Sequence, residues 1–231
     1  MAAKTGDSGS SVLALVAARN EEDRIADTVA ALCAVPAVGS VVVVDDGSRD
    51  RTVDRARSAH ATVVRGGPAG KGDAIEAALS VTPAADVYVL ADGDLGASAV
   101  GLAPLVDAVL ARRTDLAVGV LPEPPTGGFG LVKRFASAAV GRIAGYRPRA
   151  PLSGQRVATR ECLWACRPLA RGFGLESAMT ADAVRMGFRV EEMPVKVEHR
   201  FTTKDPAGFL HRGRQGADIV RAMATRIAGL R

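Results

Sequence analysis

The chain is short of aromatic residues and cysteines and has no long apolar run, and each shortage removes a class of protein. The three cysteines, Cys33, Cys162 and Cys166, fit neither an even disulfide framework nor a zinc-binding spacing, so we expect reduced thiols that pack as small buried groups. No apolar stretch approaches the roughly 20 residues of a membrane-spanning helix. Aromatic residues make up 4% of the 231 residues, against 48% hydrophobic residues and 25 glycines. This composition favours one α/β domain in which helices pack closely on a sheet.

Two common phosphate-binding motifs are also missing. Residues 66–72 resemble a P-loop, but Arg65 replaces its first glycine and Gly72 replaces the Ser or Thr that would hold magnesium. A dinucleotide-binding fingerprint would follow the first strand, where residues 17–22 read Ala-Ala-Arg-Asn-Glu-Glu. The sequence therefore argues against both classes of nucleotide-binding protein.

Positive charge is concentrated at the carboxyl end of the chain. The formal net charge is +5, and residues 200–231, with seven Lys/Arg against two Asp, carry all of it. Apolar residues in this tail form one stripe at helical spacing, which predicts a basic amphipathic helix over residues 206–231, packed on the same domain. Such a helix presents either a solvated face or a surface for phosphate groups or an anionic membrane.

The most informative feature is a pair of apolar runs that end in acids. Residues 41–44 are four valines that lead into Asp45 and Asp46, and residues 87–91 lead into Asp-Gly-Asp at 92–94. A continuous β-branched run is typical of a strand that is buried on both faces of a parallel sheet. Because ligands bind at the carboxyl ends of such strands, we expect a site for a cation or a hydroxyl-rich ligand at this edge.

Strand-like and helix-like runs alternate along the first half, which indicates βαβ units on a parallel sheet. Strands are expected near residues 12–17, 40–45, 61–65, 86–91 and 115–120, and helices near 21–34, 50–59, 71–80 and 98–112. A Gly/Pro-rich loop follows at 121–131. Beyond it we expect helices near 132–144, 160–166 and 175–186, a short strand after Gln155, and closing strands at Arg189–Glu192 and Val195–His199. Residues 1–10 read as a disordered leader.

The acids at the strand ends have specific chemical uses. Asp92 and Asp94 could both face one divalent ion, and hard oxygen ligands suit Mg²⁺ or Mn²⁺; the alternative is a solvated turn. Asp45 and Asp46 could accept hydrogen bonds from a base or ribose, or could only shape a turn. Lys71, at the start of a predicted helix, could reach a phosphate or be a surface lysine.

Four short motifs follow one another in order. They are Ala-Arg-Asn-Glu-Glu after the first strand, Val-Val-Asp-Asp-Gly-Ser, Gly-Lys-Gly-Asp-Ala and Asp-Gly-Asp-Leu. Together they resemble the family 2 glycosyltransferases of the GT-A fold over about residues 12–200. The resemblance implies a GT-A catalytic domain at residues 11–205, with a mostly parallel central sheet flanked by helices. It also implies hexose transfer from a UDP or GDP sugar, with a divalent metal on the diphosphate, and donor binding by Ala17, Arg19, Asn20, Glu21, Asp45, Asp46, Gly47, Lys71, Asp92 and Gly93.

The second half of the chain resembles two branches of this family. Ser153-Gly154 with Arg156 and Arg160 is similar to the polyprenyl-phosphate sugar synthases, whose metal motif continues as Asp-Leu-Gln. This chain has Asp94-Leu95-Gly96 and so lacks that third side-chain ligand. Residues 172–176 with His199 instead resemble glucosyl-3-phosphoglycerate and mannosylglycerate synthases, where a histidine completes the metal site. The resemblance therefore makes His199 the candidate third ligand.

The predicted catalytic residues are Asp94, Glu176, Arg156 and Arg160. Glu176 could orient a sugar hydroxyl or act as a base, while the two arginines could hold an acceptor phosphate through paired hydrogen bonds. The favoured acceptor is a polyprenyl phosphate, which fits a cytoplasmic protein with peripheral membrane contact through its tail and no nucleic-acid partner. Two alternatives stay open: transfer to a soluble phosphorylated acid such as 3-phosphoglycerate, and sugar-nucleotide binding without turnover.

Overall fold

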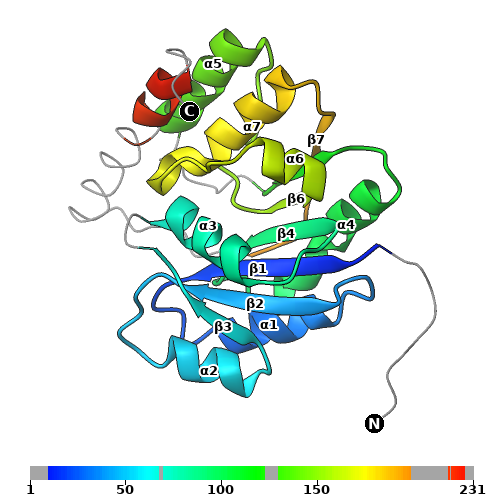
Figure 1. Cartoon of the computed structure of the whole chain (residues 1–231), viewed down its shortest axis with the longest axis vertical. Coiled ribbons are helices and arrows are strands. Elements are labelled where there is room, and N and C mark those ends of the chain that lie inside the picture. The colour runs from blue at the N-terminus through cyan, green and yellow to red at the C-terminus, as the bar shows by residue number, and fades with distance from the viewer. Residues whose placement is uncertain (1–9, 68–69, 123–129, 199–217, 219, 227–231) are drawn as a thin grey trace.

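One seven-stranded sheet runs through the part of the chain that the computed structural model describes, which is residues 10–67, 70–122, 130–198, 218 and 220–226 (Figure 1). Its strand order is β3-β2-β1-β4-β6-β5-β7. The strands are β1 (Val12–Ala18), β2 (Ser40–Asp45), β3 (Thr62–Arg65), β4 (Val87–Asp92), β5 (Leu116–Val120), β6 (Arg156–Thr159) and β7 (Val190–Pro194). The helices are α1 (Ile25–Cys33), α2 (Thr52–Ser58), α3 (Lys71–Val81), α4 (Ala103–Leu110), α5 (Gly130–Ala144), α6 (Arg160–Ala165) and α7 (Leu175–Arg185), with 3-10 helices η1 (Gly96–Leu102) and η2 (Gly172–Gly174).

The sheet is mostly parallel, as the sequence predicts. Strands β1 to β4 pair in parallel, and β5 pairs in parallel with β7, whereas β6 runs antiparallel to both of its neighbours. The central strands are buried on both faces, and all four valines of β2 are buried. Covering both faces with helices is the arrangement that such apolar strands require.

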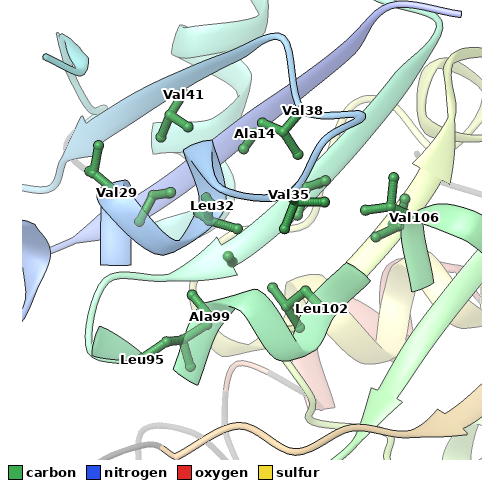
Figure 2. Packing of buried hydrophobic residues seen from close by; sticks show 14 of the residues in the cluster. Ala14, Val29, Leu32, Val35, Val38, Val41, Leu95, Ala99, Leu102 and Val106 are labelled. Atoms are coloured by element: carbon green, nitrogen blue, oxygen red, sulfur yellow. The ribbon is translucent and has the colours of Figure 1, made fainter. Parts of the chain in front are cut away.

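Helices cover the two faces of the sheet in separate layers. On one face α1, α2, η1 and α4 enclose a core that includes Leu32, Leu95 and Leu102, which Figure 2 shows from close by. On the other face α3, α6 and α7 pack around Ile75, Leu90 and other buried residues. Helix α5 lies outside α7 and forms a third cluster with it (Figure 1).

The helix predicted near residues 98–112 is two helices. The chain forms η1 and then α4, with Pro104 in the first turn of α4, where its missing N–H costs no hydrogen bond. Gly101 lies so close to the backbone of Lys196 that a Cβ atom there would overlap the Lys196 carbonyl. This tight crossing packs η1 against the segment that follows β7.

One of the two predicted closing strands is wrong. β7 forms as Val190–Pro194, but residues 195–198 make no strand. The amide of Val195 still donates to the Val120 carbonyl (3.1 Å), after which the chain leaves the sheet and crosses beneath η1. Val195 and Val197 are buried there in the core. Apolar residues at every second position are typical of a strand, but here the two valines pack into the core from a segment that forms no strand.

The described part of the tail is helical and packs on the domain. Residues 218 and 220–226 have helical conformation, and Ala222 and Met223 are buried against α5 and α7. Arg226 reaches the fully buried Asp182 of α7, with 2.7 Å between Nη2 and Oδ2. The remainder of the predicted helix and the first nine residues of the predicted leader lie outside the described residues.

The cysteines divide into two groups. Cys162 and Cys166 are buried, as expected, and the hydrogen bond between them together with burial raises the pKa of the Cys162 thiol. Cys33 is exposed at the end of α1, so the expectation of burial is wrong for this residue. No helix among the described residues has the length and apolar character needed to span a bilayer.

Candidate active site

The carboxyl ends of β2, β1 and β4 lie side by side. The strand register pairs Ala18 with Asp45 on one side of β1 and Ala17 with Asp92 on the other. The strand order reverses at β1, because β2 and β3 lie on one side of it and β4 on the other. Such a switch point leaves a crevice in which ligands of open α/β sheets bind. The fold therefore brings the two predicted acidic strand ends to one edge.

The loops that follow β1 and β2 are hydrogen-bonded to each other. The amide of Asn20 donates to Ser48 Oγ (3.0 Å), and Asn20 Oδ1 accepts from the amide of Arg49 (2.9 Å). Asp45 Oδ1 accepts from the amide of Ser48 (3.0 Å). Asn20 has φ 57°, a left-handed conformation that asparagine tolerates better than most residues. Asn20 and Asp45 thus shape the loop pair.

Arg19 and Asp46, two further predicted donor-binding residues, lie next to each other at this edge. Arg19 Nη1 lies 3.9 Å from Asp46 Oδ2, and the Arg19 side chain is 61% exposed. Partial burial, together with the neighbouring Asp45 carboxylate, raises the pKa of Asp46 despite the opposing pull of Arg19. The adjacent Gly47 takes φ 78°, which turns the chain back over the edge. The main chain of Glu21 is held by α2, because its amide donates to Thr52 Oγ1 (2.7 Å).

The turn after β4 is supported by helix α1. The buried Thr28 hydroxyl lies 2.9 Å from the Gly93 carbonyl and accepts from the amide of Gly96 (2.8 Å). Arg24 Nη1 donates to the Asp94 carbonyl (3.1 Å), and the amide of Gly93 donates to Ala17 (2.9 Å). The backbone that carries both predicted metal ligands is therefore fixed from α1 and β1.

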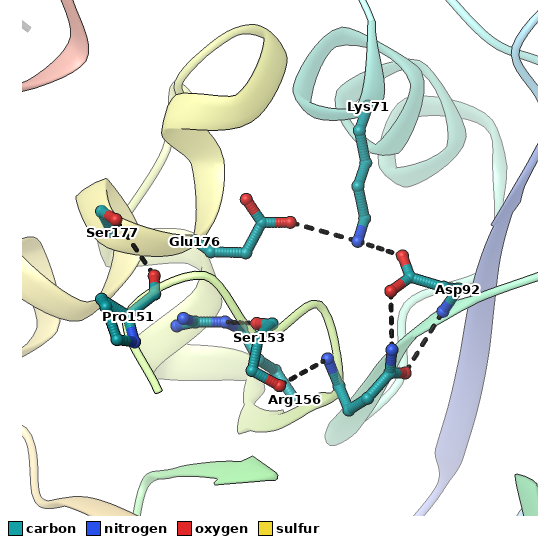
Figure 3. A network of polar contacts seen from close by, with 8 residues as sticks. Lys71, Asp92, Pro151, Ser153, Arg156, Glu176 and Ser177 are labelled. Carbon is teal, nitrogen blue, oxygen red and sulfur yellow. Dashed lines mark hydrogen bonds and ion pairs between the residues drawn. The ribbon is translucent and has the colours of Figure 1, made fainter. Parts of the chain in front are cut away.

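Lys71 joins the metal motif to α7. Its Nζ atom lies 2.5 Å from Asp92 Oδ1 and 3.1 Å from Glu176 Oε1. Figure 3 draws both contacts as dashed lines. Burial alone would lower the pKa of Lys71, but the carboxylates of Asp92 and Glu176 outweigh it and raise the pKa above its usual value. Lys71 is therefore a fixed positive charge between two carboxylates, within reach of a ligand at this edge.

Gln155 is a site residue that the sequence reasoning missed. Its Nε2 atom donates to Asp92 Oδ2 (2.6 Å), and its Oε1 atom accepts from the amide of Asp92 (3.3 Å). The sequence carried a signal for it, because this uncharged polar residue directly precedes strand β6. In the structure Gln155 is buried. The preceding Gly154 lies so close that a Cβ atom on it would overlap Asp92 Oδ2.

The two arginines predicted to hold an acceptor phosphate lie in different places. Arg156 is fully buried below Glu176, where Nε donates to the Ser153 carbonyl (2.8 Å) and Nη1 donates to Thr180 Oγ1 (2.9 Å). Burial lowers the pKa of Arg156, against the effect of the Glu176 carboxylate. Arg160 begins α6 at the opposite end of β4, where its amide donates to the Asp86 carbonyl (2.8 Å). The structure does not bring Arg160 to the candidate site.

The described residues supply two of the three predicted metal ligands. His199 lies outside them, and within the ranges described no three His, Cys, Asp or Glu side chains cluster in a way that could hold a metal ion. Asp92 and Asp94 nevertheless fit Mg²⁺ or Mn²⁺, because such ions are often held by one or two carboxylates with water and substrate phosphates completing the shell.

A cavity of about 380 Å³ adjoins the far side of the turn, lined by Asp23, Arg24, Asp27, Leu95, Gly96, Ala97, Ser98 and Glu198.

Comparisons with known proteins identify the family. The family described as "Glycosyl transferase family 2" matches residues 14–156, so the chain belongs to glycosyl transferase family 2. Glycosyltransferase AglJ of Haloferax volcanii is 27% identical over 179 residues, and the match covers 76% of this chain but 59% of that relative. The chain thus spans well under two thirds of this curated relative's length.

Solved structures agree on the fold. Glucosyl-3-phosphoglycerate synthase from Mycobacterium tuberculosis, in complex with Mg²⁺ and UDP, superposes with a TM-score of 0.80 at 26% identity, covering 94% of this chain and 79% of the other. The same enzyme with Mn²⁺, UDP-glucose and phosphoglyceric acid gives a TM-score of 0.78 at 26% identity, covering 94% and 80%. The predicted GT-A fold is confirmed.

Proposed function

We propose that the protein is a metal-dependent glycosyltransferase that moves a hexose from a nucleoside diphosphate sugar to a phosphate-bearing acceptor. The observation that carries this proposal is the meeting of Asp92, Lys71 and Glu176 beside the switch point of the sheet. Membership of family 2 supports the reaction class, and the solved neighbour that holds UDP-glucose supports a uridine donor.

In this proposal Asp92 and Asp94 hold Mg²⁺ or Mn²⁺, the ions with which the solved neighbours were crystallised. His199 is the proposed third ligand. The ion would supply positive charge where the leaving diphosphate becomes more negative. The loops built by Arg19, Asn20 and Glu21 and by Asp45, Asp46 and Gly47 would hold the nucleoside, because they form the other wall of the same edge.

Lys71 and Glu176 have complementary roles in this proposal. Lys71 keeps its positive charge at neutral pH, since its pKa lies above the usual value, so it can stabilise phosphate oxygens of the donor. Glu176 stands across from Asp92 with Lys71 between them, which places it to orient a hydroxyl of the sugar or the acceptor. A phosphate nucleophile carries its own negative charge, so a strong base is not required for that acceptor class.

The acceptor is the finer part of the proposal, and two phosphate-bearing classes have support. Phosphoglyceric acid in the solved neighbour favours a small phosphorylated acid. A lipid-linked phosphate is favoured by α5, where Leu131 and Phe135 are exposed beside basic residues, and by the absence of any Asp or Glu from 124 to 160 of the sequence. Because Arg156 is buried and Arg160 lies at the far edge, neither is proposed to bind the acceptor phosphate directly.

The donor is tested by titrating UDP-glucose and GDP-mannose into the protein with and without Mn²⁺, followed by a transfer assay. We expect one nucleotide sugar to bind only with the metal and Asp94→Asn to abolish both binding and transfer. Unchanged turnover in Asp94→Asn would remove this residue from the site. Tight metal-dependent binding with no turnover on any acceptor would instead favour a binding protein.

The acceptor is tested by comparing 3-phosphoglycerate with a polyprenyl phosphate in the same assay, together with co-sedimentation on anionic vesicles at low and high salt. Transfer to 3-phosphoglycerate without vesicle binding favours the soluble acceptor. Salt-sensitive vesicle binding with transfer to the lipid favours the polyprenyl phosphate and a peripheral membrane contact of the basic tail.

A further inference from the structure

Gln155 contacts the first predicted metal ligand through both ends of its side-chain amide. Its NH₂ group donates to Asp92 Oδ2 at 2.6 Å, and its carbonyl oxygen accepts from the main-chain amide of Asp92 at 3.3 Å. A side chain that makes both bonds fixes the rotation of the carboxylate as well as its position. Of the two carboxylate oxygens, Oδ2 then faces Gln155 and Oδ1 faces Lys71.

Gln155 is itself held firmly in place. The residue is 1% exposed. Its main-chain carbonyl accepts from the amide of Gly119 in β5 (2.8 Å), and its main-chain N–H donates to Ser153 Oγ (3.3 Å). Gly119 leaves room for it, because a Cβ atom at position 119 would lie 3.2 Å from Gln155 Cβ. The strand pair β5–β6 therefore fixes the main chain of Gln155, and the side-chain amide of Gln155 in turn sets the position of Asp92.

The residue type fits a supporting role. A Lys or Arg here would neutralise the carboxylate, and an Asp or Glu would repel it, whereas an amide donates a hydrogen bond without changing its charge. Gln155 therefore leaves the charge of Asp92 unchanged, and Lys71 is the cation that meets this carboxylate at its other oxygen. Partners that orient a ligating carboxylate in this way typically contribute about 10- to 100-fold to metal affinity.

We propose that Gln155 is a positioning residue that holds the Asp92 carboxylate in its metal-binding orientation. The inference rests on the proposed function, since it takes Asp92 as a metal ligand. Gln155 itself need not touch the ion, because both of its polar atoms are already engaged by Asp92.

The test measures Mn²⁺ affinity of the full chain with saturating UDP, from the electron paramagnetic resonance signal of free Mn²⁺. Gln155→Met keeps the side-chain length and removes both hydrogen bonds, and we expect about 10- to 100-fold weaker Mn²⁺ binding. Gln155→Asn keeps the amide but is one methylene too short to reach Asp92, and we expect weakening of the same order. In the transfer assay the Mn²⁺ concentration for half-maximal rate should rise more than kcat falls.

The matched control is Thr114→Val, at the opposite edge of the same sheet. The buried Thr114 hydroxyl donates to the main-chain carbonyl of Arg189 (2.7 Å), so its loss should lower the unfolding midpoint and leave Mn²⁺ affinity unchanged. Asp92→Asn is the second reference and should abolish Mn²⁺ binding.

These variants separate the two hypotheses. If Asp92→Asn abolishes Mn²⁺ binding but Gln155→Asn and every folded Gln155 variant stay within about twofold of the wild type, the positioning role is wrong and the metal site stands. If Asp92→Asn binds Mn²⁺ as the wild type does, the proposed function fails and the inference falls with it.

Discussion

The first four strands and the last three contribute to the candidate site in different ways. Around β1, β2 and β4 the hydrogen bonds that hold the edge mostly have a main-chain group as one or both partners, such as those from Gly93 to Ala17 (2.9 Å) and from the amide of Asn20 to Ser48 Oγ (3.0 Å). Around β6 and α7 it is held by side chains, through Gln155 on Asp92 and Glu176 on Lys71. The proposed donor side thus depends largely on the path of the chain, and the side formed by β6 and α7 depends on pairs of polar side chains.

This difference decides where single substitutions act. A main-chain hydrogen bond survives most side-chain changes, whereas a buried polar side chain that loses its partner costs the desolvation of the group left behind. We therefore expect single substitutions to have larger effects in the second part of the molecule than in the first.

The largest effect is expected from Arg226→Ala, in the second part. Arg226 is 6% exposed and pairs with Asp182, which is fully buried, at 2.7 Å. Arg226→Ala takes away the cation that pairs with this buried carboxylate, and breaking a buried ion pair in this way typically costs about 3–5 kcal/mol. Urea unfolding should show the loss, and hydrogen exchange should place it in α7 before β1 and β2.

A double variant distinguishes charge from packing at this pair. Arg226→Met with Asp182→Leu replaces both groups by apolar ones, and buried ion pairs replaced in this way are often neutral or more stable. Recovery of most of the lost stability is the expected result. A double variant as unstable as Arg226→Ala would show that the pair acts through shape.

The second effect concerns Gly72, where the two parts touch. A Cβ atom at position 72 would overlap the carbonyl of Ala170, and neither backbone can move away easily. Gly72→Ala should destabilise the protein by about 1–3 kcal/mol, the usual cost of overpacking. The matched control is Gly130→Ala in the first turn of α5, where a Cβ atom meets nothing within 4 Å and urea unfolding should change little.

The third effect should appear in binding more than in stability. A Cβ atom on Gly154 would meet the ends of two movable side chains, Asp92 and Lys71, rather than backbone. Gly154→Ala should therefore fold normally but displace both groups, weakening Mn²⁺-dependent UDP binding by about tenfold, or about 1.4 kcal/mol. Calorimetric titration measures the affinity. Wild-type affinity in this variant would mean that Asp92 and Lys71 adjust without loss.

The same division explains what the sequence could predict. The valine run of β2 and the acid-tipped end of β4 predicted their strands and their common edge, because burial on two faces leaves a local pattern. The family resemblance is likewise carried mainly by residues in the first part. These features depend on neighbours in the chain.

The second part depends on contacts between distant residues, which no local pattern records. Gln155 meets a residue 63 positions away, and Lys71 meets Glu176 from another helix. Arg156 and Arg160 looked like a pair of phosphate ligands, but β6 runs antiparallel to β4 and separates them, so Arg156 is buried near the site and Arg160 lies at the far edge. The direction of the four-residue strand β6 therefore decides which of the two arginines lies near the site.

The smallest effect concerns pH and lies at the edge opposite the site. Arg189 donates to both carboxylate oxygens of Asp115, with Nε 3.0 Å from Oδ2 and Nη2 2.8 Å from Oδ1. These hydrogen bonds lower the pKa of Asp115 below its usual value, although burial opposes them. A lowered pKa in the folded state gives stability that is present above the unfolded-state pKa and is lost as the pH falls through the folded-state pKa.

Asp115→Asn should therefore be less stable than the wild type near about pH 7, and the difference should shrink below about pH 4 as Asp115 in the wild type becomes protonated. We expect the smallest change of the four, because the Arg189 side chain is 57% exposed and solvent screens the pair. Urea midpoints of both proteins across this range provide the measurement. A difference that stays constant into strong acid would show that Asp115 stabilises the start of β5 through its shape and not its charge.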